Sequence, residues 1–307
     1  MTPPHSALTA FARPRMTPYP TPRHTSVLPA EVARLLDPKP GETWVDCTVG
    51  AGGHARLIAE RIIPGGRLIG LDQDAAMLDR ARPRLDGLPV TLAHANFDQL
   101  PEVLANLGID RVDGVLADLG FASDQVDDPA RGLSFKEDGP LDMRLDPTAG
   151  QTAADLVNRM SEKALADVIY EYGEERKSRW VAKRIVEQRK EKPFETTGEL
   201  AEVVRRSVPR SGAIDPATRT FQALRIAVND ELGALDRLLA ALPKLLRPGG
   251  RAGIISFHSL EDRRAKHAFR VREVWDAVTK KPVEASDAET AANPRARSAK
   301  LRVARRR

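Results

Sequence analysis

The chain has 307 residues, of which 41% are hydrophobic and 30% charged, with 48 Lys and Arg against 43 Asp and Glu. This is enough apolar material for a sizeable core in one large domain or two. No segment approaches the roughly 18 consecutive apolar residues of a membrane span, so we expect no membrane partner. The single cysteine, Cys47, excludes an internal disulfide and favours a reducing, cytoplasmic compartment. The net charge of +5 is compatible with a polyanionic partner but does not require one.

Both ends of the chain are basic. Residues 1–23 contain three arginines, no acid and many prolines, so we predict a disordered arm. A targeting peptide is the disfavoured alternative, because the prolines of RPRMTPYPTPR would break its amphipathic helix. At the other end, NPRARSAKLRVARRR predicts either a solvated tail or a strand or arm that contacts phosphates.

Short apolar runs that alternate with helical patterns predict a parallel sheet with helices on both faces. The run WVDCTV stops at glycines, and the following HARLIAERI has apolar residues at helical spacing. The five predicted strands cover residues 44–49, 66–72, 90–96, 113–118 and 251–257. The segment SAKLRVA, residues 298–304, is predicted as an edge strand.

The pattern changes between residues 127 and 221, where no segment has a convincing strand pattern. Helical patterns occur instead in TAADLVNRM, EKALADVIYEY, EERKSRWVAKRIVEQRKEK and GELAEVVRRSV. Ser161 is the predicted N-cap of the second helix, and Thr197 that of the fourth. We interpret residues 127–221 as an all-helical domain inserted into a discontinuous α/β domain of residues 24–126 and 222–307.

The third of these helices is basic and contains a tryptophan, within the stretch KSRWVAKRIVEQRKEK. Two interpretations fit this composition. One is an ordinary amphipathic helix with Trp180 in its core stripe, and the other is a nucleic-acid surface. We favour the first, because charged residues on a solvated helix face are common without such a partner.

The stretch DCTVGAGGHARLIAE contains a glycine pattern at the first predicted strand-to-helix turn. Gly50, Gly52 and Ala55 fit the pattern G-x-G-x-x-[GA], which binds a dinucleotide pyrophosphate. The pattern alone is weak, because the same turn serves ligands that have no phosphate. Asp46 stands four residues before Gly50, where enzymes that use S-adenosylmethionine often have an acid that orients the methionine ammonium group.

Polar or aromatic residues follow the predicted strands at the sheet edge where open parallel sheets bind ligands. Asp72 ends the second strand about twenty residues after the glycines, where a carboxylate accepts both ribose hydroxyls of an adenosine. Phe97 follows the third strand, where its ring can pack on adenine, and Asp118 ends the fourth, beside the reacting centre. Taken singly, the two acids are also explained as helix caps and Phe97 as a core residue.

Seven motifs along the chain carry a resemblance to a known family. They are DCTVGAGGHARLI, GLDQD, DGVLADLG, RGLSFKEDGPLDMRLDP, YGEER, PATRTFQALRIAVNDEL and SFHSLEDR, in this order. From residue 24 to residue 304 the chain resembles the bacterial small-subunit ribosomal RNA cytosine-N4 methyltransferases of the MraW/RsmH family. The resemblance implies a Rossmann-like class I methyltransferase domain interrupted by a helical domain. It also implies S-adenosyl-L-methionine as cofactor and 16S rRNA within the small (30S) ribosomal subunit as substrate.

The resemblance assigns residues to the cofactor pocket as well. Gly52, Gly53 and His54 would line the cofactor, Asp72 would hold the ribose, and Phe97, Asp118 and Gln125 would complete the pocket. Without the resemblance, a histidine that opens a helix is better explained as a capping or surface group. Asp124 stands where the family more usually has the proline of Ser-Ser-Pro-Gln. This departure leaves Gln125 in register but puts the rigidity of the loop in doubt.

The implied reaction is methyl transfer from a sulfonium to the exocyclic N4 amine of a cytosine in the decoding region. Such a one-step displacement depends mainly on aligning the two reactants. The amine lone pair is delocalised into the ring, so an oxygen acceptor on an N–H favours a pyramidal nitrogen and disperses the developing positive charge. Asp118 is our candidate acceptor. A role in cofactor binding alone is the alternative, because the family lacks the Asp-Pro-Pro-Tyr motif of other amino-methyltransferases.

The target base must also be reached. A stacked cytosine hides its amine, so we expect a single-stranded, flipped or irregular RNA segment. Arg219 of PATRTF and His258, Ser259 and Arg263 of SFHSLEDR are candidate RNA contacts. For the two arginines, ion pairs with nearby acids are an equally weighted alternative.

Two other protein classes fit part of the sequence. A NAD-dependent oxidoreductase fits the glycine pattern, but Asp46 and the lack of evident hydride-transfer machinery argue against it. A non-catalytic RNA-binding or assembly factor fits the basic charge, but an inactive site has no physical need for acids at three strand ends. The sequence alone gives neither the oligomeric state nor the assembly stage of the ribosomal substrate.

Overall fold

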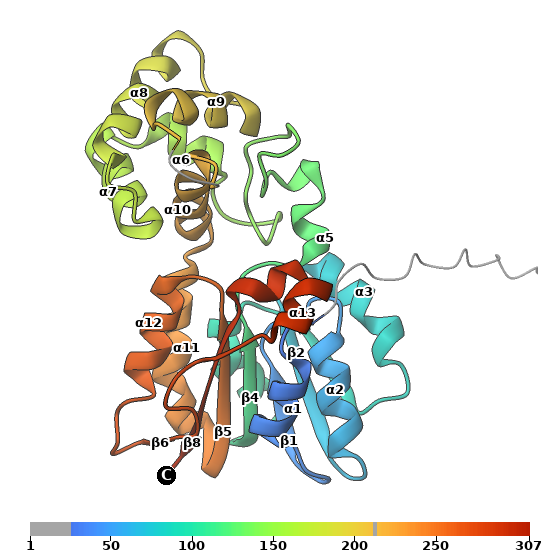
Figure 1. Ribbon diagram of the computed structural model, residues 1–307. Coiled ribbons are helices and arrows are strands. Elements are labelled where there is room, and N and C mark those ends of the chain that lie inside the picture. The colour runs from blue at the N-terminus through green and yellow to red at the C-terminus, as the bar shows by residue number, and fades with distance from the viewer. Residues whose placement is uncertain (1–25, 211–213) are drawn as a thin grey trace, which may run out of the picture.

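The computed structural model describes residues 26–210 and 214–307, so the arm predicted for residues 1–23 lies outside the described part. One eight-stranded sheet forms its centre, in the order β3-β2-β1-β4-β5-β8-β6 with β7 paired to β8 (Figure 1). The strands are β1 (Thr43–Asp46), β2 (Arg67–Asp72), β3 (Val90–His94), β4 (Val112–Asp118), β5 (Leu246–Ser256), β6 (Trp275–Ala277), β7 (Val283–Glu284) and β8 (Lys300–Arg306). Strands β1 to β5 are parallel to one another, and each overlaps one of the five predicted strands. The predicted α/β fold with a mainly parallel sheet is confirmed.

Helices cover both faces of this sheet, because successive strand residues point to opposite sides. Trp44 packs with the apolar residues of one face, whereas its neighbour Val45 packs with those of the other. The first face is covered by α1 (Pro29–Leu36), α2 (Gly53–Ile62) and α3 (Ala75–Leu85), and the second by α4 (Leu100–Asn106), α11 (Glu231–Leu245) and α12 (Ser259–Ala268). None of the described helices is both long and apolar enough to cross a membrane.

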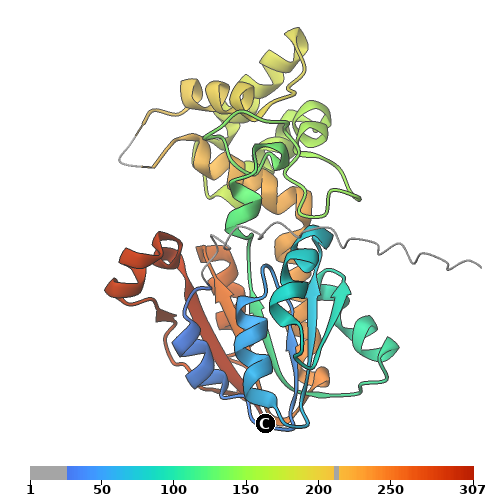
Figure 2. The same ribbon diagram turned by 90° about the vertical axis from the view of Figure 1, so that its right-hand side faces the viewer.

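Helices form a separate lobe between β4 and β5 (Figures 1 and 2). The lobe contains α6 (Ala153–Arg159), α7 (Glu162–Gly173), α8 (Ser178–Glu191), α9 (Thr197–Ser207) and most of α10 (Ala217–Asn229). These helices share their own apolar core, with residues such as Ile169, Ile185 and Leu200. In the described residues of this segment, the only β pairing is an isolated bridge between Pro140 and Thr196. The lobe lies beyond the carboxyl ends of the parallel strands (Figure 1).

Helix α10 connects the lobe to the sheet. Its first turns contribute Phe221 and Leu224 to the core of the lobe, and Ile226 packs with Leu232 of α11 and Leu260 of α12. The helix therefore passes through the predicted domain boundary at residues 221 and 222 without a break. The boundary stays a prediction, because α10 crosses it and no linker separates the two parts there.

The predictions for two helix caps and for one tryptophan in the lobe can be compared with the structure. Ser161 caps α7 as predicted, since its side chain accepts a hydrogen bond from Ala164 N. For α9 the predicted cap was wrong by one residue, because Thr196 accepts from Glu199 N while Thr197 is fully buried. Trp180 does not join the core stripe either. The residue is 46% exposed, while the buried apolar stripe of α8 consists of Val181, Ala182 and Ile185.

The basic C-terminal segment forms a strand, as predicted, but not at the edge of the sheet. Strand β8 is an internal strand, paired with β5 on one side and with β6 and β7 on the other. Its Arg302 is buried and forms two hydrogen bonds with Asp262 of α12, at 2.6 and 3.0 Å. Arg305 pairs with Asp276 of β6 at 3.2 Å. The segment is therefore neither a solvated tail nor an edge strand, and several of its arginines neutralise acids of the same domain.

Candidate active site

A cleft opens where the carboxyl ends of β1, β2 and β4 meet. It encloses about 900 Å³, including the space at its mouth. Small-molecule and cofactor sites typically measure about 300 to 1,000 Å³. Among the predicted cofactor residues, Gly53, His54, Asp72, Phe97, Asp118 and Gln125 line this cleft. Sequence reasoning missed Arg295, which lines the cleft from the 3-10 helix η3 (Pro294–Ser298).

The glycine turn after β1 has two functions in this geometry. Gly50 adopts a positive φ of 51°, and its N–H donates to Asp72 Oδ2 at 2.8 Å. Gly52 is the N-cap of α2 with φ of 85°, and a Cβ added there would lie 3.3 Å from the Cβ of Ala81 in α3. Gly52 therefore permits the turn and the close helix packing but does not line the cleft, contrary to its predicted contact with the cofactor. Gly53 does line the cleft.

Three ionisable side chains lie close together at the ends of β1 and β4. His54 Nε2 is 3.5 Å from Asp118 Oδ2, and the imidazole is almost fully buried. His54 is thus neither a cap nor a surface group. Burial lowers the pKa of His54, but the negative charges of Asp118, Asp46 and Glu289 outweigh burial and raise it overall. Asp118 Oδ1 is buried and accepts no hydrogen bond from any described residue.

Asp46 lies behind the cleft wall and is fully buried. Its Oδ1 accepts a hydrogen bond from Thr48 N at 3.1 Å, whereas Oδ2 has no partner among the residues that the structure describes. Burial raises the pKa of Asp46 to about 6, and His54 partly opposes this rise. Since Asp46 does not line the cleft, its geometry does not support the direct contact to a ligand ammonium group that we expected.

The predicted ribose and adenine contacts lie on the β2 and β3 side of the cleft. Asp72 accepts hydrogen bonds from Gly50 N at 2.8 Å and Asp74 N at 2.9 Å. Burial raises the pKa of Asp72 to about 6 despite these bonds. Phe97 begins the 3-10 helix η1 (Phe97–Gln99) and is half-buried in the cleft wall. An acid and an aromatic ring thus lie on adjacent strand ends, as the sequence predicted.

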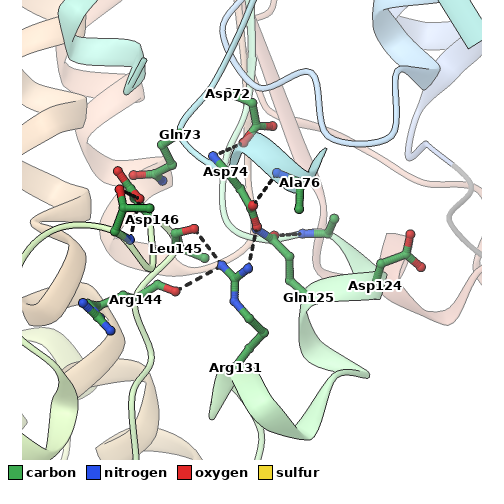
Figure 3. Close-up of polar contacts among 12 residues, drawn as sticks. Asp72, Gln73, Asp74, Ala76, Asp124, Gln125, Arg131, Arg144, Leu145 and Asp146 are labelled. Carbon is green, nitrogen blue, oxygen red and sulfur yellow. Dashed lines mark hydrogen bonds and ion pairs between the residues drawn. The ribbon is translucent and has the colours of Figure 1, made fainter. Parts of the chain in front are cut away.

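Gln125 lines the cleft, but both ends of its amide are already engaged (Figure 3). Its Oε1 accepts from Ala122 N, and its Nε2 donates to Asp74 Oδ2, both at 2.8 Å. Asp74 also pairs with Arg131 Nη1 at 2.9 Å, and Arg131 Nη2 donates to the backbone oxygen of Leu145 at 2.7 Å (Figure 3). This network ties the cleft to the chain entering the helical lobe. No local sequence pattern predicts this network, because its partners lie far apart in the chain.

Asp124, where we expected a less rigid loop, forms an ion pair that holds the loop. Its Oδ2 lies 2.6 Å from Arg80 Nη1 of α3. It belongs to the short helix α5 (Ser123–Val126), next to Gln125. An ion pair to the neighbouring helix thus constrains this segment.

The four predicted RNA contacts do not lie together. Arg219 and Arg263 line the same hollow between α7 and α12, and the side chain of each is 56% exposed. Each also faces an acid, Arg219 at 3.8 Å from Glu175 and Arg263 at 3.5 Å from Glu174. Ser259 donates to Glu174 as well, at 2.6 Å.

His258 lies apart from that hollow. Its side chain is largely buried at the N-terminus of α12, and Nε2 is 3.2 Å from Glu261 Oε1. Sequence reasoning singled out His258 from the motif SFHSLEDR and overlooked the buried acid three residues later.

The sheet order, the glycine turn and the acids at three neighbouring strand ends define an α/β enzyme that binds a nucleoside-containing cofactor. The model of the MraW methylase family matches residues 21–307. The chain belongs to this methylase family, as the resemblance predicted. Membership removes the NAD-dependent oxidoreductase from consideration.

Relatives extend the match over nearly the whole chain. Ribosomal RNA small subunit methyltransferase H from Sorangium cellulosum (strain So ce56) is 52% identical over 296 residues, covering 94% of this chain and 93% of that protein. The protein of the same name from Deinococcus deserti is 52% identical over 285 residues, covering 92% and 93%. Among solved structures, Aeropyrum pernix fibrillarin with bound S-adenosyl-L-methionine overlays with a TM-score of 0.40 and 11% identity, over 90% of this chain and 73% of that one.

The cost of burying the Asp46 carboxylate can be tested by measuring the free energy of unfolding as a function of pH. Because its pKa is raised to about 6 in the folded protein, the ionised form disfavours folding, and this cost develops as the pH rises from about 4 to about 6. We expect Asp46→Asn to increase the free energy of unfolding at pH 8 by up to about 3 kcal/mol, with no difference below about pH 4. Urea unfolding across this pH range measures the effect.

Asp110→Asn, at an exposed position, is the matched control and should give no such pH dependence. A destabilising effect of Asp46→Asn that is the same at all pH values would contradict this account of the buried carboxylate.

Proposed function

We propose that the protein transfers a methyl group from S-adenosyl-L-methionine to the exocyclic N4 of a cytosine in the decoding region of 16S rRNA, within the small (30S) ribosomal subunit. The substrate class is supported by the relatives, which are small-subunit ribosomal RNA methyltransferases. The choice of an amino nitrogen is supported by Asp118, which brings a buried, unpaired carboxylate oxygen to the cleft wall in the described structure. This substrate implies a cytoplasmic location.

The residues of the cleft fit S-adenosyl-L-methionine. Asp72 has accepted only two backbone hydrogen bonds, so its oxygens retain lone pairs for the two ribose hydroxyls. The half-buried ring of Phe97 offers an apolar surface for adenine. Gly53 and His54 would border the methionine part on the β1 side. When bound, the cofactor supplies a methyl group activated by the positive sulfur.

Alignment and hydrogen bonding are what the chain itself contributes to the reaction. Asp118 accepts an N–H of the target amine, which favours a pyramidal nitrogen with its lone pair free for the methyl group. Burial lowers the pKa of the adjacent His54, but hydrogen bonding to Asp118 and the charge of that carboxylate raise it overall, and this interaction keeps the carboxylate in place. After transfer, the nitrogen loses a proton, for which the Asp118 carboxylate is the nearest predicted acceptor.

The helical lobe is the proposed substrate-recognition domain, in line with the predicted division of the chain. Arg219 of α10 and Arg263 of α12 face the same hollow as Arg176 and Tyr170 at the edge of the lobe. Their ion pairs with Glu175 and Glu174 are long, and more than half of each arginine side chain is exposed. Guanidinium groups in this setting can bind RNA phosphates without first losing a strong internal partner.

The direct test is transfer of an isotope-labelled methyl group to small subunits purified from cells that lack this activity. Mass spectrometry of RNase fragments then locates the label. We expect N4-methylcytidine at one site of the decoding region. Binding of cofactor without any labelling of subunits would contradict the proposed substrate, and RNA binding without cofactor affinity would instead indicate a non-catalytic assembly factor.

Asp118→Ala separates catalysis from cofactor binding. If Asp118 accepts an N–H in the transition state, we expect turnover to fall by about 100-fold or more, with a much smaller loss of cofactor affinity. Single-turnover labelling measures the first quantity, and calorimetry with S-adenosylhomocysteine measures the second. Asp118→Asn, which keeps the shape but not the charge, serves as the control for local structure. Equal losses in turnover and affinity would assign Asp118 to cofactor binding alone.

Replacing Arg219 and Arg263 together by Ala tests the hollow at the edge of the lobe. We expect the KM for subunits to rise and the salt dependence of binding to become shallower by about two in the logarithmic slope, since about one unit is lost per phosphate contact. Filter binding at several salt concentrations gives this slope. Arg56→Ala, an exposed arginine of α2 on the face opposite α11, is the control. An unchanged slope would show that the two arginines do not contact RNA phosphates and serve only as ion-pair partners of Glu175 and Glu174.

A further inference from the structure

A hollow lies at the opposite end of the sheet domain from the cleft, and we name it the β6 hollow. It is bordered by the end of α12, by β6 and by β8, and it encloses about 1060 Å³ including the open space at its mouth. Ser256, at the carboxyl end of β5, pairs with Lys300 at the start of β8, whereas Trp275 of β6 pairs with Arg306. The step from Lys300 to Arg306 corresponds to about 20 Å of strand. The β6 hollow is therefore too far from the cleft to contact the reacting atoms.

Positive charge is in excess on the walls of this hollow. One acid, Asp276, faces six cations, which are Lys266, Arg270, Arg272, Lys280, Arg302 and Arg307. Arg302 is neutralised by Asp262 of α12. Asp276 is shared between Arg307 at 2.8 Å and Arg305 at 3.2 Å, so it is not free to pair with the others.

Four of these cations are left without an internal partner. The side chains of Lys266, Arg270, Arg272 and Lys280 form no ion pair or hydrogen bond with any residue in the described part of the chain. Lys266 is half-buried and the other three are exposed. Like charges around one concave surface add to a single positive field, which attracts a polyanion. The β6 hollow thus fits an anionic partner.

The aromatic residues of the hollow are not available for stacking. Phe269 and Trp275 are 4% and 3% exposed, and they pack edge to face with ring centroids 5.3 Å apart. Proteins that stack nucleobases do so on exposed rings. The β6 hollow offers cations without such a platform. It is therefore suited to phosphate groups, whose contacts carry no sequence information.

One face of α12 connects the β6 hollow with the hollow at the edge of the helical lobe. The helix runs from the lobe toward β6 (Figure 1). Arg263 lines the hollow at the lobe, and His267 and Arg270 follow it by four and seven residues, so the three lie on one face. The helical backbone continues to Arg270, whose N–H donates to the oxygen of His267. Seven residues of helix cover about 10 Å, so a phosphate chain bound at Arg263 can continue to the β6 hollow.

Resting on the proposed function, we propose that the β6 hollow binds phosphates of the small-subunit RNA at a distance from the methylated cytosine. This contact adds affinity and orients the protein on the subunit, and it takes no part in the reaction. An acidic protein segment is the rival occupant. Continuity with the proposed phosphate contact Arg263 favours RNA.

Replacing Arg270 and Arg272 together by Ala tests the contribution to binding. We expect the KM for subunits to rise by about fivefold or more, and the logarithmic salt slope of binding to become shallower by about two, one unit per phosphate contact. The kcat at saturating subunits and the affinity for S-adenosylhomocysteine should stay within about twofold of wild type, because the variant leaves the cleft intact. The retained affinity also shows that the variant is folded.

The matched control removes two exposed arginines from the opposite face of the sheet. Arg34 belongs to α1 and Arg61 to α2, and the side chain of neither pairs with an acid in the residues that the structure describes. Arg34→Ala combined with Arg61→Ala lowers the net charge by the same amount. We expect this variant to keep the KM and the salt slope of the wild type.

Cross-linking identifies what occupies the hollow. Cys47 is the only cysteine and is buried, so Arg272→Cys introduces a single accessible thiol. A benzophenone attached to this thiol is irradiated while the protein is bound to small subunits. We expect an adduct that RNase shortens and that maps to one region of the RNA. The same probe on Arg34→Cys should give little adduct with RNA.

Two results would overturn the proposal. A probe on Arg272→Cys that reacts only with a ribosomal protein, or not at all, would show that the β6 hollow does not contact RNA. An unchanged KM and salt slope would show that Arg270 and Arg272 are solvated surface charges. If the wild-type protein cross-links to RNA but does not methylate subunits, the proposed function is at fault and the RNA contact stands.

Discussion

Burial of like charges at one edge of the sheet is the constraint on which the site depends. Asp46, Asp72 and Asp118 end three neighbouring strands, and each ionised carboxylate disfavours the others in a medium that water does not screen. His54 interacts with two of them, Asp118 and Asp46, and the N–H of Gly50 in the glycine turn donates to the third, Asp72. The turn after β1 therefore matters as a source of N–H donors for the protein's own acids, as well as for any ligand.

The helical lobe and the sheet domain are joined through side chains that also border the site. Arg131, at the entry to the helical lobe, binds Asp74 next to the predicted ribose contact. Helix α10, at the exit, carries Arg225, which fixes Glu231. A movement of the lobe would thus displace side chains on both walls of the cleft. Rigid packing of α10 against Leu232 and Leu260 favours the lobe and the sheet moving as one unit.

The strands and the family were accessible from the sequence, because apolar runs and contiguous motifs are local signals. Features set by distant partners were not. Trp180 and Val181 are neighbouring apolar residues on one helix, and only packing against the rest of the lobe decides which one is buried. Whether a strand is internal depends on its pairing partners. The arginine-rich sequence of β8 suggests an exposed strand, because the acids that neutralise these arginines lie elsewhere in the chain. Glu261 was overlooked because a buried acid has no sequence pattern of its own.

The internal position of β8 has a consequence for biosynthesis. Strands β6 and β7 have β8 as their only partner among the described strands, and β5 pairs with it along its outer edge. Residues 275–284 therefore cannot take up their final backbone hydrogen bonds until residues 300–306 have been synthesised. While the chain is still emerging, the outer edge of β5 stays open to pairing with other strands. Completion of the sheet therefore waits until β8 has left the ribosome and can pair with β5.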